Sequence, residues 1–259
     1  MATFFGEVVS VFSRAVDEED EDEDEEIRNE LAGRRGISIQ WSPESRMSSE
    51  DTASRSIPCS TFLVAVGENA VGFLNSFVQC SGSWEIIGAV RLWNERITRK
   101  DPVDKQFPSD SSCLLYRLTS NPTVFENVQK RSLNVIVLSC SSVTEYKSSK
   151  SIPSIPVPFL RALKTRALQE TPHCQLLEQP NVISGLPAAV LTYCQAREIP
   201  AVLYHCYSDI TTLDTLTIEA FKPVLACRSL NTLVKDNSRS AEILKQLVDA
   251  NKIQSNLYT

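Results

Sequence analysis

A strand, a turn and a helix follow one another at residues 61–77, and this unit constrains the fold more than any other stretch. T-F-L-V-A-V at 61–66 is a short apolar run with strand chemistry, and Gly67–Asn69 supplies a turn. The next apolar residues fall at the i, i+3, i+4, i+7 spacing of one helix face: Ala70, Phe73, Leu74 and Phe77. The unit indicates an α/β fold. Because Gly67 and Gly72 complete neither common phosphate-binding motif, nucleotide binding is not predicted here.

Other apolar runs extend this prediction along the chain. Strands are predicted at 85–93, 113–118, 133–139 and 199–207, with a strand stub at 123–125. Helices are predicted at 159–169, 186–197 and 213–226, the last bent or ended by Pro223, and Pro- and Ser-rich loops at 98–112 and 141–158. We therefore expect a single, three-layer-like α/β domain with a central mixed sheet, over residues 57–250.

The connection between Phe125 and the strand that begins at Leu133 is unusually short. Only residues 126–132 separate them, whereas a parallel crossover needs about a dozen residues or more. The two strands are therefore expected to pair as a hairpin or to be joined in an unusual way.

The N-terminal region, residues 1–56, is expected to be disordered. Asp17–Glu26 is a run of ten acids, which repel one another and cannot pack. Solvation and docking to a basic surface both remain open as roles for this run. The net charge is −6, and without the ten acids it would be +4, so the chain lacks the strong basic stripe of a nucleic-acid binder.

The eight cysteines indicate free thiols in a reducing compartment. They are spread along 259 residues without a C-x-x-C pair, unlike the dense pattern of a secreted disulfide scaffold, and most are expected to be small core residues. The first twelve residues lack the basic start of a secretory signal, and no apolar run reaches the ~18 residues of a membrane helix. Neither export nor membrane insertion is expected.

No catalytic or metal site is predicted from the polar residues. His173 lies in a predicted loop, and His205-Cys206 lies in a predicted strand, where neighbouring side chains point to opposite faces and cannot chelate one ion together. A Cys–His pair assembled from distant residues stays open. Three acids are candidates by location only, with capping or solvation as the alternative: Asp209, Asp214 and Glu219.

The C-terminal residues form a candidate docking tail, residues 251–259. Ser240 can cap a helix over Ala241–Ala250, whose apolar residues fall on one face: Ile243, Leu244, Leu247 and Val248. A hydrophobic residue, a tyrosine and a terminal carboxylate follow at Leu257, Tyr258 and Thr259. A terminal carboxylate can be captured by a lysine or by backbone amides, and the tyrosine adds a large rigid contact. A pocket-filling tail and a loose end are both open at this point.

Several stretches together resemble the proteasome assembly chaperones, which help to build the α-ring of the 20S proteasome. The stretches are M-A-T-F-F-G-E-V-V at 1–9, V-A-V-G-E-N-A-V-G-F-L at 64–74, L-W-N-E at 92–95, S-N-P-T-V-F at 120–125, P-F-L-R-A-L-K-T at 158–165, L-L-E-Q-P-N at 176–181, L-P-A-A-V-L-T-Y-C at 186–194, E-A-F-K-P at 219–223 and I-Q-S-N-L-Y-T at 253–259. The resemblance covers nearly the whole chain, and none of these stretches is a general catalytic signature.

The resemblance implies a non-enzymatic, cytoplasmic protein without a cofactor or metal, with association with the endoplasmic reticulum as an open addition. It implies a nucleoside-phosphorylase-like fold without catalytic equipment, and a heterodimer with proteasome assembly chaperone 2. The pair would bind 20S proteasome α-subunits, notably types 5 and 7, promote ring closure and block wrong α-ring dimers. Leu257, Tyr258 and Thr259 match the family's hydrophobic-Tyr-any tail, which enters a pocket between α-subunits, where the carboxylate pairs with a lysine.

The chain departs from the family in one place. Members are expected to carry an extra strand–helix segment of about twenty residues after the position of Phe125, the length of connection that is missing here. A shortened isoform, a gene-model artefact and a real loss are all open. The alternative function is an α/β enzyme or nucleoside-binding protein, and a bare scaffold with a passive tail is a third.

Overall fold

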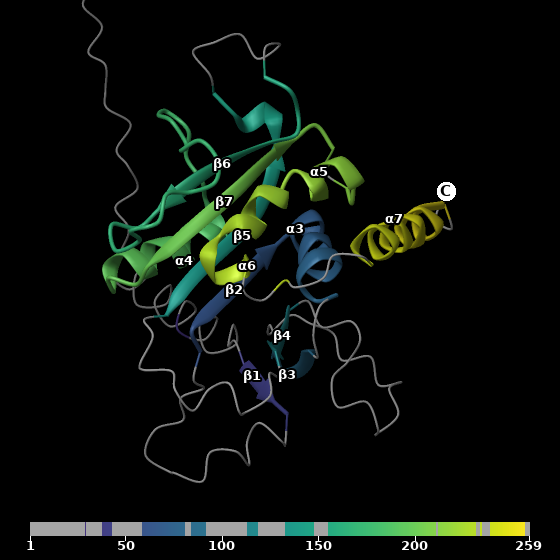
Figure 1. Ribbon diagram of the computed structural model, residues 1–259, viewed down its shortest axis with the longest axis horizontal. Coiled ribbons are helices and arrows are strands. Elements are labelled where there is room, and N and C mark those ends of the chain that lie inside the picture. The colour runs from purple at the N-terminus through teal and green to yellow at the C-terminus, as the bar shows by residue number, and fades with distance from the viewer. Residues whose placement is uncertain are drawn as a thin grey trace, which may run out of the picture. The chain divides into compact units, whose positions relative to one another are not determined.

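The chain folds into two compact units. The computed structural model describes residue 29 and residues 38–42, 59–80, 84–91, 113–118, 133–147, 155–210, 212–231, 234 and 239–256. One unit comprises residues 1–53 and 85–117, and the other comprises residues 54–84 and 118–259. Figure 1 labels the helices and strands of the chain. The α/β class is confirmed, but the expected single domain with one central sheet is corrected to two units with two sheets.

The smaller unit is built on a three-stranded sheet in the order β1-β3-β4. β1 (Ser38–Trp41) pairs antiparallel with β3 (Trp84–Arg91), and β4 (Cys113–Leu118) is the third strand. A Cβ on Gly88 would lie 2.9 Å from the Gln40 carbonyl oxygen, so the close approach of β1 to β3 needs glycine here. The strands predicted at 85–93 and 113–118 are confirmed.

β1 is an ordered strand within residues 1–56, a region that is expected to be mostly disordered. Ser38–Trp41 forms a strand, because β3 offers it a ladder of backbone partners that the sequence around it does not reveal. The acidic run Asp17–Glu26 and most of this region lie outside the described residues, so their predicted disorder stays a prediction.

The larger unit contains a four-stranded mixed sheet in the order β2-β5-β7-β6. β2 (Thr61–Val66), β5 (Asn134–Ser142) and β7 (Ala201–Ser208) are parallel, and β6 (Phe159–Lys164) is antiparallel at the edge. The runs predicted as strands at 61–66, 133–139 and 199–207 are therefore confirmed. The predicted stub at 123–125 and its hairpin pairing lie outside the described residues.

β6 corrects the helix predicted at 159–169. The sequence F-L-R-A-L-K is rich in good helix formers, but its backbone pairs with β7 from Phe159↔Tyr207 to Lys164↔Val202. Edge pairing gives every second residue of β6 a place in the core, and that tertiary contact outweighs the intrinsic helix preference. The strand also places Arg161 on the face opposite Ala162.

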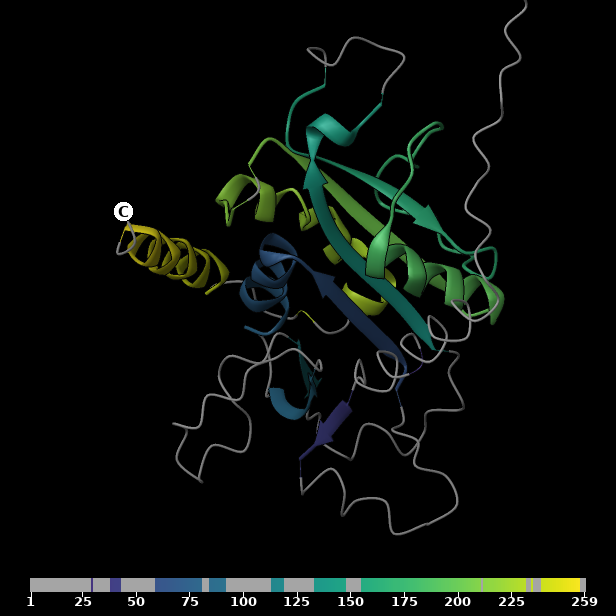
Figure 2. The same ribbon diagram turned by 180° about the vertical axis from the view of Figure 1, so that it is seen from behind.

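Most of the described helices pack on one face of this sheet, which we call the covered face. They are α3 (Glu68–Phe73), η1 (Leu74–Val78), α5 (Thr215–Glu219), η5 (Lys222–Ala226), α6 (Arg228–Asn231) and α7 (Ser240–Asn256), and they share one buried cluster with the sheet. α4 (Gly185–Ala196) packs on β5 and β7 on the opposite face, the α4 face, which Figure 2 shows from its own side. A short 3-10 helix, η3 (Val143–Glu145), follows β5.

Two predicted helices take the expected places with local changes. The helix predicted at 186–197 is α4, and the one predicted at 213–226 divides into α5 and η5. The division occurs before Pro223, which has no backbone N–H to donate and therefore suits the first turn of the second piece.

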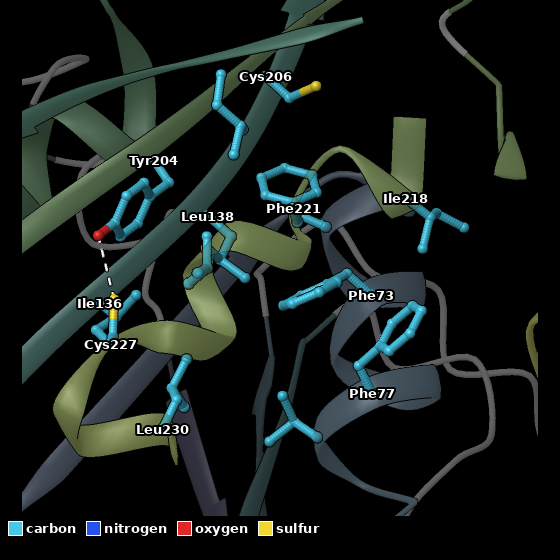
Figure 3. Packing of buried hydrophobic residues seen from close by; sticks show 14 of the residues in the cluster. Phe73, Phe77, Ile136, Leu138, Tyr204, Cys206, Ile218, Phe221, Cys227 and Leu230 are labelled. Atoms are coloured by element: carbon cyan, nitrogen blue, oxygen red, sulfur yellow. Dashed lines mark hydrogen bonds between the residues drawn. The ribbon is translucent and has the colours of Figure 1, made fainter. Parts of the chain in front are cut away.

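The core of the covered face is aromatic at its centre (Figure 3). The Phe73 ring centroid lies 5.3 Å from that of Phe77 and 5.6 Å from that of Phe221, and Phe73 and Phe221 are fully buried. On the same face, the Tyr204 hydroxyl lies 3.1 Å from Cys227 Sγ. These contacts join α3 and η1 to η5 and to the middle of β7.

Candidate functional site

The helix α7 provides the mount for the predicted C-terminal tail. Leu244 and Val248 are buried in the core of the covered face, as the predicted apolar face requires. The helix continues to Asn256, six residues beyond the expected Ala250, so the first six residues of the predicted 251–259 tail are helical. Leu257, Tyr258 and Thr259 lie outside the described residues, and their docking role stays a prediction.

His205 is enclosed on the α4 face near the carboxyl ends of β5 and β7. Its Nδ1 lies 2.7 Å from Ser139 Oγ and its Nε2 lies 2.9 Å from Ser141 Oγ. Burial lowers the pKa of His205 from 6.5 to about 4, so the ring is neutral at pH 7. Among the described residues no carboxylate contacts the ring, and Ser139 is almost fully buried. The ring is therefore held between one buried hydroxyl, that of Ser139, and one partly exposed hydroxyl, that of Ser141.

The expected divergence of His205 and Cys206 is confirmed. Cys206 lies on the covered face with Cys140, its neighbour across the ladder between β5 and β7. A hydrogen bond with Cys140 and burial raise the pKa of the Cys206 thiol. The pair in sequence therefore cannot bind one ion from one side of the sheet.

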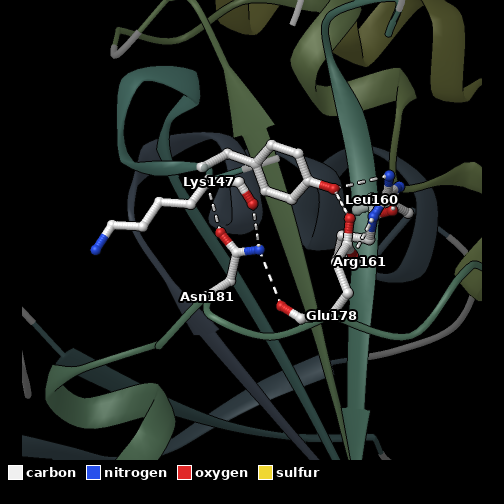
Figure 4. Close-up of polar contacts among 6 residues, drawn as sticks. Lys147, Leu160, Arg161, Glu178 and Asn181 are labelled. Atoms are coloured by element: carbon white, nitrogen blue, oxygen red, sulfur yellow. Dashed lines mark hydrogen bonds and ion pairs between the residues drawn. The ribbon is translucent and has the colours of Figure 1, made fainter. Parts of the chain in front are cut away.

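Arg161 organises a polar cluster next to His205 (Figure 4). Its Nη2 donates to the Tyr146 hydroxyl at 3.2 Å, its Nη1 donates to the Leu160 carbonyl at 2.9 Å, and its Nε lies 3.3 Å from Glu178 Oε2. The Tyr146 hydroxyl in turn donates to Glu178 Oε1. The guanidinium also lies over the ring of Phe159, 4.7 Å from its centroid.

Glu178 and Asn181 come from the L-L-E-Q-P-N stretch at 176–181, and they give that stretch a structural role. Burial raises the pKa of Glu178, but the hydrogen bond from Tyr146 and the charge of Arg161 outweigh it and hold this pKa below its usual range. Asn181 accepts the Lys147 N–H at 2.7 Å and donates to the Lys147 carbonyl at 2.9 Å. Two loops are thereby fastened to each other and to β6.

The acids that were candidates by location serve local structure. Asp214 is the N-cap of α5 and accepts the Thr217 N–H at 2.9 Å. Glu219 pairs with Lys222 at 2.7 Å on an exposed surface, and Asp209 is exposed. The capping and solvation alternatives therefore hold for these side chains.

Glu170, His173 and Cys227 bring three possible metal-ligand atoms within 4.8 Å of one another. Each atom already has a protein partner. Glu170 Oε1 accepts the Arg228 N–H at 3.1 Å and lies 3.3 Å from His173 Nε2, while Cys227 Sγ lies 3.1 Å from the Tyr204 hydroxyl. Burial raises the pKa of the Cys227 thiol, which disfavours the thiolate that binds metals. We interpret this cluster as a hydrogen-bonded joint between a loop and α6, which spacing alone could not reveal.

None of the eight cysteines forms a disulfide bond. Cys194, Cys206 and Cys227 are buried in the core, and Cys140 and Cys174 are partly buried and pack against it, as expected for most of the cysteines. Cys59 and Cys113 are exposed. None of the helices in the described ranges is both long and apolar enough to cross a membrane.

An apolar groove lies at the other end of the α4 face, near the amino ends of the strands. It encloses about 400 Å³ and is lined by Phe62, Leu133, Val135, Ala189, Val190, Tyr193, Cys194 and Ile199. Phe62 is 45% exposed and Tyr193 is 59% exposed, although both lie on elements whose sequences predict burial. The sequence therefore did not reveal this surface.

Comparison with known proteins identifies relatives along the whole chain. A family model described as proteasome assembly chaperone 4 (PAC1) matches residues 1–126 and 123–259. Proteasome assembly chaperone 1 of Xenopus tropicalis is 46% identical over 286 aligned positions, which cover 100% of both chains. Proteasome assembly chaperone 1 of Homo sapiens is 43% identical over 288 positions, which cover 100% of this chain and 99% of the relative.

Two numbers in these comparisons bear on the expected departure after Phe125. The two family-model segments meet at residues 123–126. The alignment with the Xenopus tropicalis relative spans 286 positions and the chain has 259 residues, so at least 27 aligned positions have no residue of this chain opposite them. The family-model segments thus divide at the predicted place, and the 27 positions are a total over the whole alignment.

A solved structure is also similar over most of the chain. Pyrococcus furiosus PbaA, an archaeal homolog of proteasome-assembly chaperone, aligns with 86% of this chain and 100% of its own, at 10% identity and a TM-score of 0.45. The family assignment does not depend on this similarity. Because relatives at 43–46% identity cover the chain from end to end, the chain belongs to the proteasome assembly chaperone 1 family.

Proposed function

We propose that this chain is a proteasome assembly chaperone that acts through protein surfaces. In this proposal it pairs with proteasome assembly chaperone 2, and the pair binds α-subunits of the 20S proteasome, notably types 5 and 7. It promotes closure of the α-ring and prevents wrong dimers of α-rings. The observation that carries the proposal is the end-to-end similarity, at 46% identity, to a relative named proteasome assembly chaperone 1.

In the same proposal the C-terminal residues are the ring-binding element. Leu257 and Tyr258 fill a pocket between neighbouring α-subunits, and the Thr259 carboxylate pairs with a pocket lysine. The helix α7 supports this role because it is anchored by Leu244 and Val248 and runs to Asn256, directly before the tail. One tail of this size binds weakly, and tails from both partners gain through effective concentration.

A non-enzymatic role is supported by the state of the polar groups in the described part of the chain. His205 is neutral and enclosed between two serine hydroxyls, and Glu178 is engaged by Arg161 and Tyr146. We also propose that the larger unit has a nucleoside-phosphorylase-like fold without catalytic equipment, that no cofactor is used, and that the chain works in the cytoplasm.

Removal of Leu257–Thr259 tests the tail. We expect the truncated chain to pair with proteasome assembly chaperone 2 as the full chain does, but to bind α-subunits roughly 10- to 100-fold more weakly, the range for loss of a buried aromatic anchor. The measurement is co-expression with the second chaperone, sizing of the pair, and titration with α-subunits.

Two variants complete the experiment. Glu242→Ala, on the exposed side of α7, should leave α-subunit binding unchanged. One alanine added after Thr259 moves the carboxylate and should weaken binding as the truncation does. Unchanged α-subunit binding by the truncated chain would contradict the role of the tail, and failure to pair with the second chaperone would contradict the heterodimer.

A further inference from the structure

Two cysteines meet across the ladder between the central strands β5 and β7. Cys140 of β5 and Cys206 of β7 are Cα partners in the parallel register. Because side chains alternate between the two faces along each strand, paired residues of parallel neighbours point to the same face. Both thiols accordingly lie on the covered face, where Cys206 belongs to the buried cluster and Cys140 packs against it (Figure 3).

The spacing of the strands suits a disulfide bond between these two residues. Neighbouring strands lie about 4.7–4.9 Å apart, which falls within the range of about 4.4–6.8 Å between the Cα atoms of disulfide-bonded cysteines. The two thiols already interact, because a hydrogen bond with Cys140 contributes to the raised pKa of Cys206. A bond between the two sulfur atoms therefore requires no rearrangement of the sheet.

The backbone on either side of Cys140 is held against β7 from the opposite face. Ser139 and Ser141 flank Cys140 in β5, and their hydroxyls lie 2.7 Å from Nδ1 and 2.9 Å from Nε2 of His205. His205 directly precedes Cys206 in β7. The contact on the α4 face therefore fixes the separation of the two strands at the level of the two thiols.

The two thiols differ in their access to a dissolved oxidant. Cys140 is partly exposed, whereas Cys206 is buried at 0% exposure. The hydrogen bond with Cys140 and burial raise the pKa of Cys206, so this thiol keeps its proton at neutral pH. Peroxides oxidise accessible cysteines in preference to buried ones. Cys140 is therefore expected to react first, with Cys206 as the cysteine that resolves the product.

The pairing is specific to these two cysteines among the described strands. Cys113 of β4 is the one other cysteine in a described strand, and β3 beside it contains none. Cys227, on the same face, is engaged by the Tyr204 hydroxyl, which lies 3.1 Å from its Sγ.

We propose that Cys140 and Cys206 form a redox-sensitive pair, and that a peroxide converts them into a disulfide that links β5 to β7. In a reducing compartment such a disulfide is transient, because exchange with dissolved thiols restores both cysteines. This inference goes beyond the chaperone function and does not rest on it.

The reaction has two steps. In the first, the Cys140 sulfur takes one oxygen atom from hydrogen peroxide to give a sulfenic acid, and the other oxygen leaves as water. In the second, the Cys206 sulfur bonds to the Cys140 sulfur, the S–O bond breaks, and the Cys206 proton leaves with the hydroxyl group as a second water. The two thiols together lose two electrons, and the peroxide gains them.

Peptide mapping of the full chain tests the pair. The reduced chain is treated with hydrogen peroxide, alkylated in urea, and digested without reductant by trypsin and a protease that cuts after glutamate. These enzymes place Cys140, Cys174, Cys206 and Cys227 on separate peptides. We expect a linked Cys140–Cys206 pair that dithiothreitol separates. It should be at least about tenfold more abundant than any other pairing, because the fold holds these thiols at a high effective concentration.

The exposed cysteines, Cys59 and Cys113, show when the dose of peroxide is sufficient. Absence of the Cys140–Cys206 link at a dose that oxidises both of them would overturn the proposal, and so would a link from Cys140 to another cysteine. A chain that is unfolded in urea before the peroxide is added should lose the preference for this pairing. An equal preference in the unfolded chain would show that the fold does not bring the thiols together.

Single variants assign the two roles. In Cys206→Ala, which keeps a small apolar side chain in the core, Cys140 should stop at the sulfenic acid, which dimedone traps. In Cys140→Ser, Cys206 should stay reduced at the same dose, and its oxidation there would contradict the assigned order. Cys174→Ser is the control and should form the link as the natural chain does. Circular dichroism verifies that each variant is folded, and the map of the natural chain decides the proposal if Cys206→Ala does not fold.

Discussion

The two faces of the four-stranded sheet show how the same strands can be packed in different ways. On the covered face, among the described residues, α3, η1, η5, α6 and α7 join the sheet in one large buried cluster that includes Phe73 and Phe221. On the α4 face the buried hydrophobic cluster is small: Val135, Val137, Cys194, Ala201 and Leu203. Side chains point alternately to the two faces along each strand, so the difference between the faces comes from the helices that cover them. The covered face holds the fold together, and the α4 face offers surface.

The largest expected effect compares one phenylalanine from each face. Phe73→Ala removes a fully buried ring from the covered face and should lower the free energy of unfolding by about 3–5 kcal/mol. Phe62→Ala, at 45% exposure on the α4 face, should lower it by less than about 1 kcal/mol. Denaturant unfolding monitored by circular dichroism measures both. Equal losses would mean that the two faces contribute alike, against the comparison.

The end of the α4 face that holds His205 should respond to acid. The pKa of His205 in the folded chain is lowered from 6.5 to about 4. At a pH between these two values, His205 binds a proton in the unfolded chain but not in the folded chain. The stability that this difference provides is fully present above pH 6.5 and is lost as the pH falls toward 4, by up to about 3 kcal/mol.

His205→Gln should flatten this part of the profile relative to the natural chain. His173→Gln is the control for removal of a histidine that is exposed. The measurement is the free energy of unfolding between pH 4 and pH 7. Parallel profiles for His205→Gln and the natural chain would show that the ring is not held neutral.

The Arg161 cluster should contribute more than an exposed ion pair elsewhere. The Arg161 side chain is 10% exposed and contacts Tyr146, Leu160 and Glu178, so Arg161→Met should lower the free energy of unfolding by about 2 kcal/mol. Lys222→Met breaks the exposed pair with Glu219 and should lower it by less than about 1 kcal/mol. Comparable values from urea unfolding would show that the cluster does not fasten its loops.

The smallest expected effect is at the groove end of the α4 face. Tyr193→Lys should change the free energy of unfolding by no more than about 0.5 kcal/mol, because the Tyr193 side chain is 59% exposed in the part of the chain that the structure describes. The same unfolding measurement applies. A loss above about 1 kcal/mol would mean that Tyr193 is covered within the chain and that the groove is filled.

The parts of the fold that were predictable are those with a strong local signal. The buried runs at 61–66, 133–139 and 199–207 and the apolar helix at 186–197 carry their periodicity within a few residues. β6 was mistaken for a helix because F-L-R-A-L-K suits either state, and only its pairing with β7 decides. β1 was missed because S-I-Q-W becomes a strand through a partner more than forty residues away.

The candidate sites also differ in whether local sequence or tertiary contact determines them. The divergence of His205 and Cys206 follows from strand geometry alone and was predicted. The link between Arg161 and Glu178 depends on how a loop returns over β6, and the groove depends on how α4 lies against β2 and β5, so neither can be read from residues in sequence order. The short connection after Phe125 did leave a signal, because its length is too small for a parallel crossover.

The length of α7 has a consequence for any partner that the C-terminus meets. Val248 is the last buried residue in the part of α7 whose side chains the structure describes, and the helix continues for eight more residues to Asn256, a length of about 12 Å. Three residues beyond it add at most about 11 Å even when fully extended. The distance of Asn256 from the sheet is therefore set by the length of the helix, and one added or removed turn would change it by about 5.4 Å.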